Sequence, residues 1–401
     1  MPLTLSEMCR NIAPSVTLAI DAKAKAMKAS GVDVVGLGGG EPDFPTPEPI
    51  CEAAIRAIKS GQTRYTPSSG IQQLRQAVVD KLLRDNGLSY KPEQITISNG
   101  AKHSLLNSLL AIINPGDEVI IPTPCWVSYP EMVRMTGGKP IFVQMPLGAN
   151  GEYSLPAQTI RQAVTDKTKA IILNSPQNPT GMVICKEELE DIAQVAVERG
   201  FYVISDEIYE KLIYDGCRHV SIAGLGKRIF DQTIVVGGVS KSYAMTGWRI
   251  GFAAAPMPIA KLMGNYQSHS TSNPNSIAQW ASVVAFEQCE DTITAMRDAF
   301  DKRRKTMVSG IKAIPGLSCS EPRGAFYVMM NIGGLFGKSY EGTVIQDAMT
   351  FAALLLEHAQ VAVVPGEAFE APDMCRLSYA CSDEEILKGL TRIRGFVEAL
   401  S

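Results

Sequence analysis

Lys241 is the residue of this sequence whose type and position are best suited to covalent chemistry. It lies in Ser240-Lys241-Ser242, directly after an apolar run at 234–238 that predicts a buried strand. A buried ammonium group loses hydration, and it escapes that cost through a lowered pKa or a covalent bond. An amine with a lowered pKa is the nucleophile of Schiff-base enzymes. An exposed loop lysine is the alternative, and this segment alone does not separate the two.

Polar side chains follow several further apolar runs that predict strands. Asn99-Gly100-Ala101-Lys102 could hold a phosphate at a helix N-terminus or form an ordinary turn. Trp126 could stack on a flat ring or pack in the core. The Asn178-Pro179 turn could aim an amide at a fixed point or be a plain loop turn. Asp206, with Tyr209 close behind, could face a protonated ring nitrogen or form a structural ion pair.

Two arginines complete the set of candidates. Arg249 lies eight residues beyond Lys241 and suits a phosphate, while Arg376 lies on an apolar run and suits a bidentate hold on a carboxylate. Each signal is weak alone. Together they meet the requirements of pyridoxal phosphate chemistry on amino acids.

The elements that must position these residues alternate between strand and helix. We expect helices at 101–113, 157–164 and 186–199, and strands at 95–98, 118–121, 140–144, 169–173, 201–205, 233–236 and 250–254. Several strands are continuous apolar runs, which indicates an α/β fold with a mostly parallel sheet covered on both faces. Ligands of such sheets bind beyond the carboxyl ends of the strands, where the candidates lie.

The ends of the chain follow a different pattern. A helix capped by Thr46 is expected at 50–60 and another at 70–86. A helical region at 276–314 precedes strands near 325–331, 361–364 and 376–378, with helices at 343–358 and 383–400. We expect a large cofactor-binding domain at 48–301, and an N-terminal arm with a smaller α/β domain at 1–47 and 302–401.

Composition excludes several classes of protein. The 401 residues are 45% hydrophobic and 20% charged, with a net charge of −3, which predicts neither a nucleic-acid nor a membrane partner. Nine scattered cysteines and four histidines have no ligand spacing, so we expect reduced thiols, no metal and a cytoplasmic protein. Three glycines at 38–40 open no helix, which argues against a dinucleotide loop.

The sequence resembles the class I/II aminotransferases of fold type I, in particular the bacterial-type aspartate aminotransferase branch, over nearly its whole length. The resemblance rests on Gly40-Glu41-Pro42-Asp43-Phe44, Tyr65-Thr66-Pro67, Asn99-Gly100-Ala101-Lys102, Trp126-Val127-Ser128-Tyr129, Asn178-Pro179-Thr180-Gly181, Ser205-Asp206-Glu207-Ile208-Tyr209, Ser240-Lys241, Met245-Thr246-Gly247-Trp248-Arg249 and Arg376-Leu377-Ser378-Tyr379.

The resemblance implies a role for each candidate toward pyridoxal 5'-phosphate. Lys241 would bind the cofactor covalently and move the substrate proton, and Asp206 would keep the pyridine nitrogen protonated. Tyr209 and Asn178 would hold the ring oxygen, and Trp126 would stack on the ring. The phosphate would be held by Gly100, Ala101, Lys102, Ser240 and Arg249. Tyr65 would reach the phosphate of a neighbouring subunit, which implies a homodimer with shared active sites.

The same resemblance implies a substrate. Arg376, Asn178 and the backbone of Gly40 would bind the α-carboxylate next to Trp126, and Ser15, Thr17 and Lys102 would bind a distal carboxylate. The expected reaction is transamination of L-aspartate with 2-oxoglutarate to oxaloacetate and L-glutamate. An aromatic, prephenate or broad-specificity aminotransferase is the alternative, although prephenate-using relatives have a lysine where this chain has Ala13. A lyase-type synthase, a ligand sensor and a Ser–Lys hydrolase are weaker alternatives.

Overall fold

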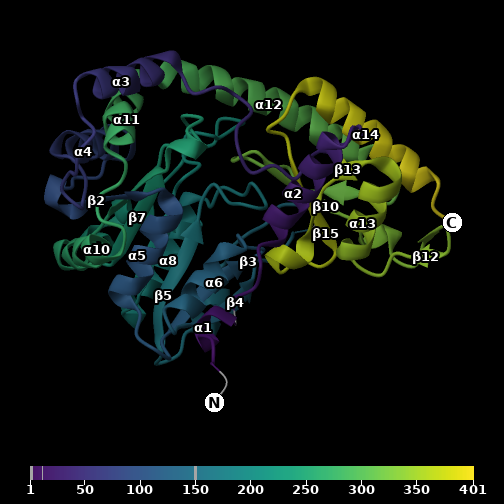
Figure 1. Ribbon diagram of the computed structural model, residues 1–401. Helices are drawn as coiled ribbons and strands as arrows, with labels where there is room; N and C mark the ends of the chain where they lie inside the picture. Colours follow the sequence, from purple (N-terminus) through teal and green to yellow (C-terminus); the bar gives the residue numbers. More distant parts are fainter. Residues whose placement is uncertain (1–2, 11, 149–150) are drawn as a thin grey trace.

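The computed structural model describes residues 3–10, 12–148 and 151–401. Figure 1 shows two bodies, each built around a sheet, with the long helix α12 (Glu290–Lys312) running from one to the other. No helix in these ranges is both long and apolar enough to cross a membrane.

The larger sheet has seven strands in the order β2-β8-β7-β6-β5-β3-β4. Strand β8 is antiparallel to both of its neighbours, and the other pairings are parallel. The strands are β2 (Ile95–Asn99), β3 (Glu118–Thr123), β4 (Lys139–Gln144), β5 (Thr168–Asn174), β6 (Tyr202–Asp206), β7 (Thr233–Gly238) and β8 (Ile250–Ala254). The predicted mostly parallel α/β sheet is therefore confirmed, with strand ends shifted by at most two residues.

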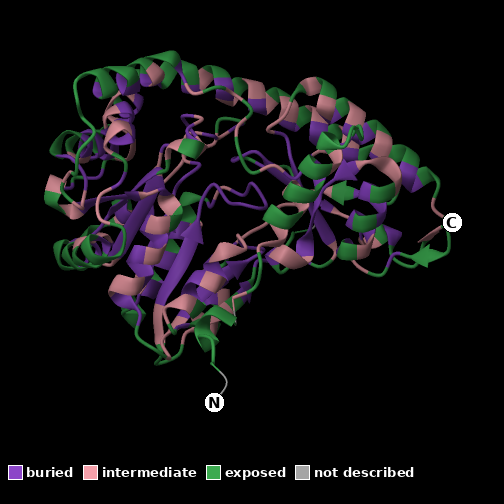
Figure 2. Cartoon of the chain, viewed as in Figure 1, coloured by how far each residue is buried: buried purple, intermediate pink, exposed green. Residues whose placement is uncertain are grey.

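Helices cover both faces of this sheet, as the continuous apolar strands require. Along β5, Ala170 and Ile172 join the core cluster that includes α5 (Ala101–Ile112) and α6 (Ser128–Met135). The alternate residues Ile171 and Leu173 join the cluster that includes α8 (Lys186–Arg199). Figure 2 shows the strands as the most buried part of this body. The remaining helices of this body are α3 (Glu48–Lys59), α4 (Gln72–Asn86), α7 (Ala157–Ala163), α9 (Lys227–Phe230), α10 (Met257–Ser270) and α11 (Ser276–Gln288).

The smaller body contains a four-stranded antiparallel sheet in the order β14-β15-β10-β9. Its strands are β9 (Ser318–Cys319), β10 (Tyr327–Asn331), β14 (Val364–Pro365) and β15 (Met374–Ser378). Strand β1 (Val35–Gly36) pairs in parallel with β13 (Val361–Ala362), and β11 (Ser339–Tyr340) forms a hairpin with β12 (Thr343–Val344). The remaining helices of this body are α2 (Val16–Ala29), α13 (Ala348–Ala359) and α14 (Asp383–Glu398), whereas the short helix α1 (Glu7–Arg10) lies against α6 of the larger body (Figure 1).

Two expected helices and one expected strand differ in extent from the structure. The helical region at 276–314 is interrupted at Cys289, which ends α11 and precedes α12. The helix expected from residue 343 begins five residues later at Ala348, because the Asp347 carboxylate caps it by accepting the Thr350 N–H at 2.7 Å. The expected strand at 361–364 is divided between β13 and β14, which belong to different sheets.

The prediction that Thr46 caps α3 is wrong. Pro47 occupies the N-cap position, and the Thr46 hydroxyl makes no bond to the helix. It instead donates to the Ala244 carbonyl at 2.7 Å and accepts from the Trp248 indole at 3.0 Å. Both partners lie some 200 positions away in the chain, so a tertiary contact has replaced the local cap.

Candidate active site

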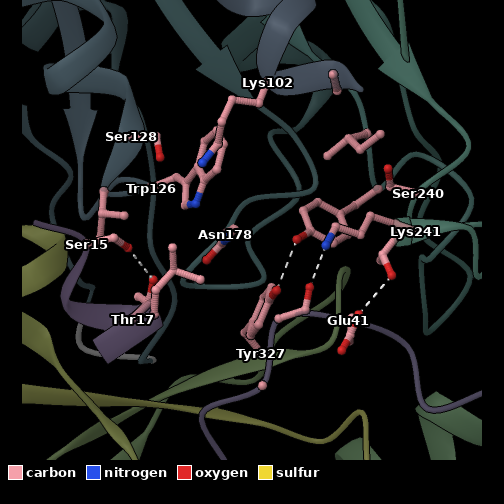
Figure 3. Close-up of a pocket in the computed structure, with 18 of the residues that line it drawn as sticks. Ser15, Thr17, Glu41, Lys102, Trp126, Ser128, Asn178, Ser240, Lys241 and Tyr327 are labelled. Carbon is pink, nitrogen blue, oxygen red and sulfur yellow. Dashed lines mark hydrogen bonds between the residues drawn. The ribbon is translucent and has the colours of Figure 1, made fainter. Parts of the chain in front are cut away.

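A cavity of about 470 Å³ opens at the carboxyl ends of the central strands of the large sheet (Figure 3). Most of the predicted site residues line it: Ser15, Thr17, Gly40, Ala101, Lys102, Trp126, Asn178, Asp206, Tyr209, Ser240, Lys241, Arg249 and Arg376. The structure thus brings together residues from both sheets and from the N-terminal segment.

Lys241 lies in the turn that follows β7, and its amine points into the cavity (Figure 3). The Nζ atom donates a hydrogen bond to the Gly40 carbonyl and lies 5.8 Å from the Tyr209 ring centroid. Loss of hydration, followed by repulsion from the Arg376 cation, lowers the pKa of Lys241 to about 8. A substantial fraction of the amine is therefore a neutral nucleophile near physiological pH.

Asp206 ends β6 and is only 3% exposed. Its carboxylate accepts the Tyr129 hydroxyl at 2.7 Å and the Ile208 N–H at 3.2 Å. Burial raises the pKa of Asp206 to about 6. No basic side chain of the described chain forms a salt bridge with it, so the arrangement suits a cation supplied by a ligand.

The turn between β2 and α5 leaves room for an anion. Gly100 caps α5 with φ +85°, and a Cβ atom there would lie 2.4 Å from Nη2 of Arg249. Arg249 has its own left-handed backbone, φ +58°, and donates to the Thr246 carbonyl at 2.9 Å. The guanidinium group and the free N–H groups of the first turn of α5 can therefore grip a phosphate together, with the buried Ser240 beside them.

Arg376 lies on β15 of the small sheet and is 3% exposed. It donates to the Asn178 side-chain oxygen and to the Gly38 carbonyl, each at 3.0 Å. Its Nε atom is buried and has no hydrogen-bond partner, and among the described residues no carboxylate forms a salt bridge with the guanidinium group. A buried cation without a counter-ion is the property expected of a carboxylate receptor.

Trp126 and Lys102 form another wall of the cavity (Figure 3). The Lys102 amine lies 4.8 Å from the Trp126 ring centroid. Loss of hydration, together with the Arg249 charge, lowers the pKa of Lys102. The hydroxyls of Ser15 and Thr17, 3.0 Å apart, lie on a further side of the cavity.

Two predicted residues do not line the cavity. Gly100 lies directly behind the wall, where it makes room for the Arg249 guanidinium group. Tyr65 is 92% exposed and lies outside the cavity.

Sequence reasoning gave no role to three residues that the structure places in the site. Tyr129 and Asn174 both bind Asp206: the Tyr129 hydroxyl donates to its carboxylate, and the Asn174 side-chain amide donates to its backbone carbonyl at 2.9 Å. Tyr327 lines the cavity with its hydroxyl 3.1 Å from that of Tyr209. Tyr129 lies three residues after Trp126, but no local pattern indicates that its partner is Asp206.

These features fit pyridoxal 5'-phosphate. A buried carboxylate without a cation suits the pyridine nitrogen, and an alanine at Gly100 would fill the space that the phosphate-binding arginine needs. An amine with a lowered pKa faces the same cavity. The fold and the site together define a pyridoxal-phosphate-dependent enzyme of fold type I.

Comparison with known proteins places the chain within that class. It belongs to the class I and II aminotransferases, whose family model matches residues 32–393. The chain is therefore an aminotransferase that depends on pyridoxal phosphate, as the sequence predicts.

The relatives are bacterial-type enzymes. An aspartate aminotransferase from Bacillus sp. (strain YM-2) is 48% identical, with 98% of this chain and 99% of the relative covered. A probable aspartate/prephenate aminotransferase from Aquifex aeolicus is 44% identical over 99% of each chain. Among solved structures, aspartate aminotransferase from Rhizobium meliloti superimposes with a TM-score of 0.95 at 41% identity, covering 100% of both chains. The Thermus thermophilus enzyme with maleate gives a TM-score of 0.92 at 43% identity, covering 98% of this chain and all of the other.

Proposed function

We propose that the enzyme transaminates L-aspartate with 2-oxoglutarate to give oxaloacetate and L-glutamate. The buried Arg376 cation without a counter-ion carries this proposal, because it suits the carboxylate shared by all four compounds. Asn178 already holds one edge of the guanidinium group, which would orient the other edge toward the substrate.

The distal end of the cavity favours a second carboxylate. Lys102 supplies a cation at the wall of the cavity that it forms with Trp126. Ser15 and Thr17 supply hydroxyl donors. Relatives named aspartate aminotransferase, and a neighbour solved with the dicarboxylate maleate, support the same substrate class.

In the proposed reaction each side chain holds or moves one group. Pyridoxal phosphate, when bound, supplies an electron sink for the pair released as the substrate Cα–H bond breaks. Arg376 and Asn178 hold the α-carboxylate, and the Lys241 amine takes and returns the Cα proton. Asp206 would stabilise a proton on the pyridine nitrogen of the cofactor.

The remaining residues keep the cofactor in place. Tyr209 would donate toward the ring oxygen of the cofactor, and Trp126 would stack on its ring. The phosphate would be held by Ala101, Lys102, Ser240 and Arg249, with Gly100 leaving the space that the Arg249 guanidinium group needs.

A substrate screen tests the proposal. Aspartate and glutamate should be turned over with kcat/KM at least about 10-fold above phenylalanine, a difference of about 1.4 kcal/mol in transition-state binding. Lys102→Ala should remove that preference while phenylalanine turnover persists. Unchanged aspartate turnover in Lys102→Ala would contradict the role of the distal site.

A prephenate aminotransferase is the second candidate, because relatives such as the Aquifex aeolicus protein carry that name. Ala13 occupies the position where such relatives have a lysine, which argues for aspartate. Prephenate in the same screen distinguishes the two functions.

We also propose a homodimer whose subunits share their active sites. The 92% exposed Tyr65 ring, with exposed apolar side chains such as Ile55 and Leu262, would be covered in such a dimer. Mixing Tyr65→Ala with Lys241→Ala subunits should restore activity, because one site of each hybrid would then be intact. Activity no higher than that of either parent would refute the shared site.

We also propose a division into two domains and a cytoplasmic location. A boundary at residue 301 lies within α12, so the large domain at 48–301 and the small domain at 1–47 and 302–401 would share a continuous helix. A cytoplasmic location is supported by nine cysteines that are all free thiols.

A further inference from the structure

Tyr327 belongs to the small sheet but faces the cavity between the two sheets (Figure 3). It begins β10, where it pairs with Ser378 of β15, and Met329 pairs with Arg376. Tyr327 and Arg376 are therefore diagonal neighbours on one face of this antiparallel pair. The side chain is 1% exposed, so its contacts are fixed by packing on all sides.

The ring of Tyr327 supports the carboxylate-binding arginine. The Arg376 guanidinium carbon lies 4.3 Å from the Tyr327 ring centroid and 4.9 Å from that of Phe369. A cation over an aromatic face is attracted most strongly where water is excluded, as it is here. The two rings thus fix the position of the Arg376 guanidinium group without a protein carboxylate. The Nε atom of Arg376 keeps no hydrogen-bond partner in the protein.

The hydroxyl of Tyr327 reaches the other half of the site. It lies 3.1 Å from the hydroxyl of Tyr209, which follows β6 of the large sheet. In the described parts of the chain neither hydroxyl has another hydrogen-bond partner. Each carries one proton, so if Tyr327 donates to Tyr209, the Tyr209 proton is left to point into the cavity.

The position of Arg376 favours that direction, because its guanidinium carbon lies 4.3 Å from the Tyr327 ring centroid. Burial raises the pKa of Tyr327, and the adjacent Arg376 cation offsets part of this rise. A cation close to the ring makes the phenol a better proton donor. In that arrangement Tyr209 would accept from Tyr327 and would be free to donate to a ligand.

We propose that Tyr327 is a positioning residue that serves both halves of the site. Its ring holds Arg376 for the α-carboxylate, and its hydroxyl directs the Tyr209 proton toward the cofactor. The inference rests on the proposed function, because it assigns Arg376 and Tyr209 the roles described above.

Two variants separate the ring from the hydroxyl, and a third is a matched control. Tyr327→Phe keeps the ring and removes the hydroxyl, whereas Tyr327→Leu removes both. Tyr379→Phe removes another fully buried tyrosine hydroxyl, which donates to the Ala325 carbonyl at 3.3 Å; neither Tyr379 nor Ala325 lines the cavity. Thermal unfolding of each variant first verifies that it folds.

The ring is tested without the cofactor, by calorimetric titration of the apoprotein with succinate. Loss of the cation–π contact should weaken succinate binding about three- to fivefold in Tyr327→Leu. Tyr327→Phe and Tyr379→Phe should stay within about twofold of the wild type. If Tyr327→Leu does not fold, Tyr327→Met repeats the test. Wild-type affinity in the folded ring-deficient variant would overturn the role of the ring.

The hydroxyl is tested by the pH titration of the visible absorption band of the bound cofactor. Tyr327→Phe should move the midpoint upward by about half a pH unit, because the Tyr209 donor is weakened by the loss of one hydrogen bond. Tyr379→Phe should not move it. An unchanged midpoint in Tyr327→Phe would overturn the role of the hydroxyl. A wild-type protein with no visible band would instead overturn the proposed function, and the inference with it.

Discussion

Replacing Gly100 with alanine should damage the phosphate site far more than it damages the fold. Gly100 has φ +85° and ψ 161°, a backbone region open essentially to glycine alone. Alanine there should cost about 1–3 kcal/mol of stability through strain. Its Cβ would also lie 2.4 Å from Nη2 and 2.9 Å from Cζ of Arg249, so the guanidinium group must move away from the helix N-terminus.

The expected loss follows from the hydrogen bonds that the displaced arginine would make. Each charge-assisted bond to a phosphate contributes about 1.5–3 kcal/mol. Loss of one such bond weakens pyridoxal phosphate binding at least about 10-fold, and loss of two about 100-fold or more. The affinity is measured by titrating the apoprotein with pyridoxal phosphate and following the visible band.

Gly226 supplies the matched control. It also precedes a helix, with φ 144° and ψ 163°, and a Cβ atom there meets nothing within 4 Å. Gly226→Ala should therefore lose a similar amount of stability and keep wild-type cofactor affinity. Equal affinity losses in the two variants would refute the clash with Arg249 as the cause, and wild-type affinity in Gly100→Ala would refute the phosphate site.

Three further predictions concern titratable groups. Because the pKa of Lys241 is lowered to about 8, the rate at which an amine-reactive reagent labels this residue in the apoprotein should reach half its maximum near pH 8. A midpoint above about 10, the ordinary range of lysine, would contradict the lowered pKa. Asp206→Asn should lower kcat at least about 100-fold. Because burial raises the pKa of Asp206 from 3.8 to about 6, the Tm of the variant apoprotein should also rise relative to that of wild type between pH 4 and 6. A Tm difference that stays constant over this range would contradict the raised pKa. Burial lowers the pKa of His219, but its 2.8 Å contact with the buried Glu207 outweighs this effect and leaves the pKa raised. The Tm of wild type should therefore exceed that of His219→Gln by its full amount below pH 6.5, and the difference should shrink as the pH rises through the raised pKa. A difference that widens with rising pH would contradict a stabilising ion pair.

The strand order in space was less predictable than the strands themselves. Runs such as 169–173 and 250–254 identified their strands because apolar side chains must be buried on both faces of a parallel sheet. Nothing local indicated that β8 would lie between β2 and β7 and run antiparallel to both. Similarly, the Thr46 cap failed because distant partners, Ala244 and Trp248, compete for its hydroxyl.

The sequence by itself determined which residues could do the chemistry. Asp206 ends a strand, and Lys241 and Asn178 each come shortly after one. The carboxyl ends of parallel strands meet at one edge of the sheet, so the convergence of these residues follows from local patterns. The tertiary structure decided the contacts that make these residues work. Asn178 meets Arg376 across 198 positions, and Tyr209 meets Tyr327 across 118. Such pairs depend on how the two sheets pack against each other, which no periodicity along the chain encodes.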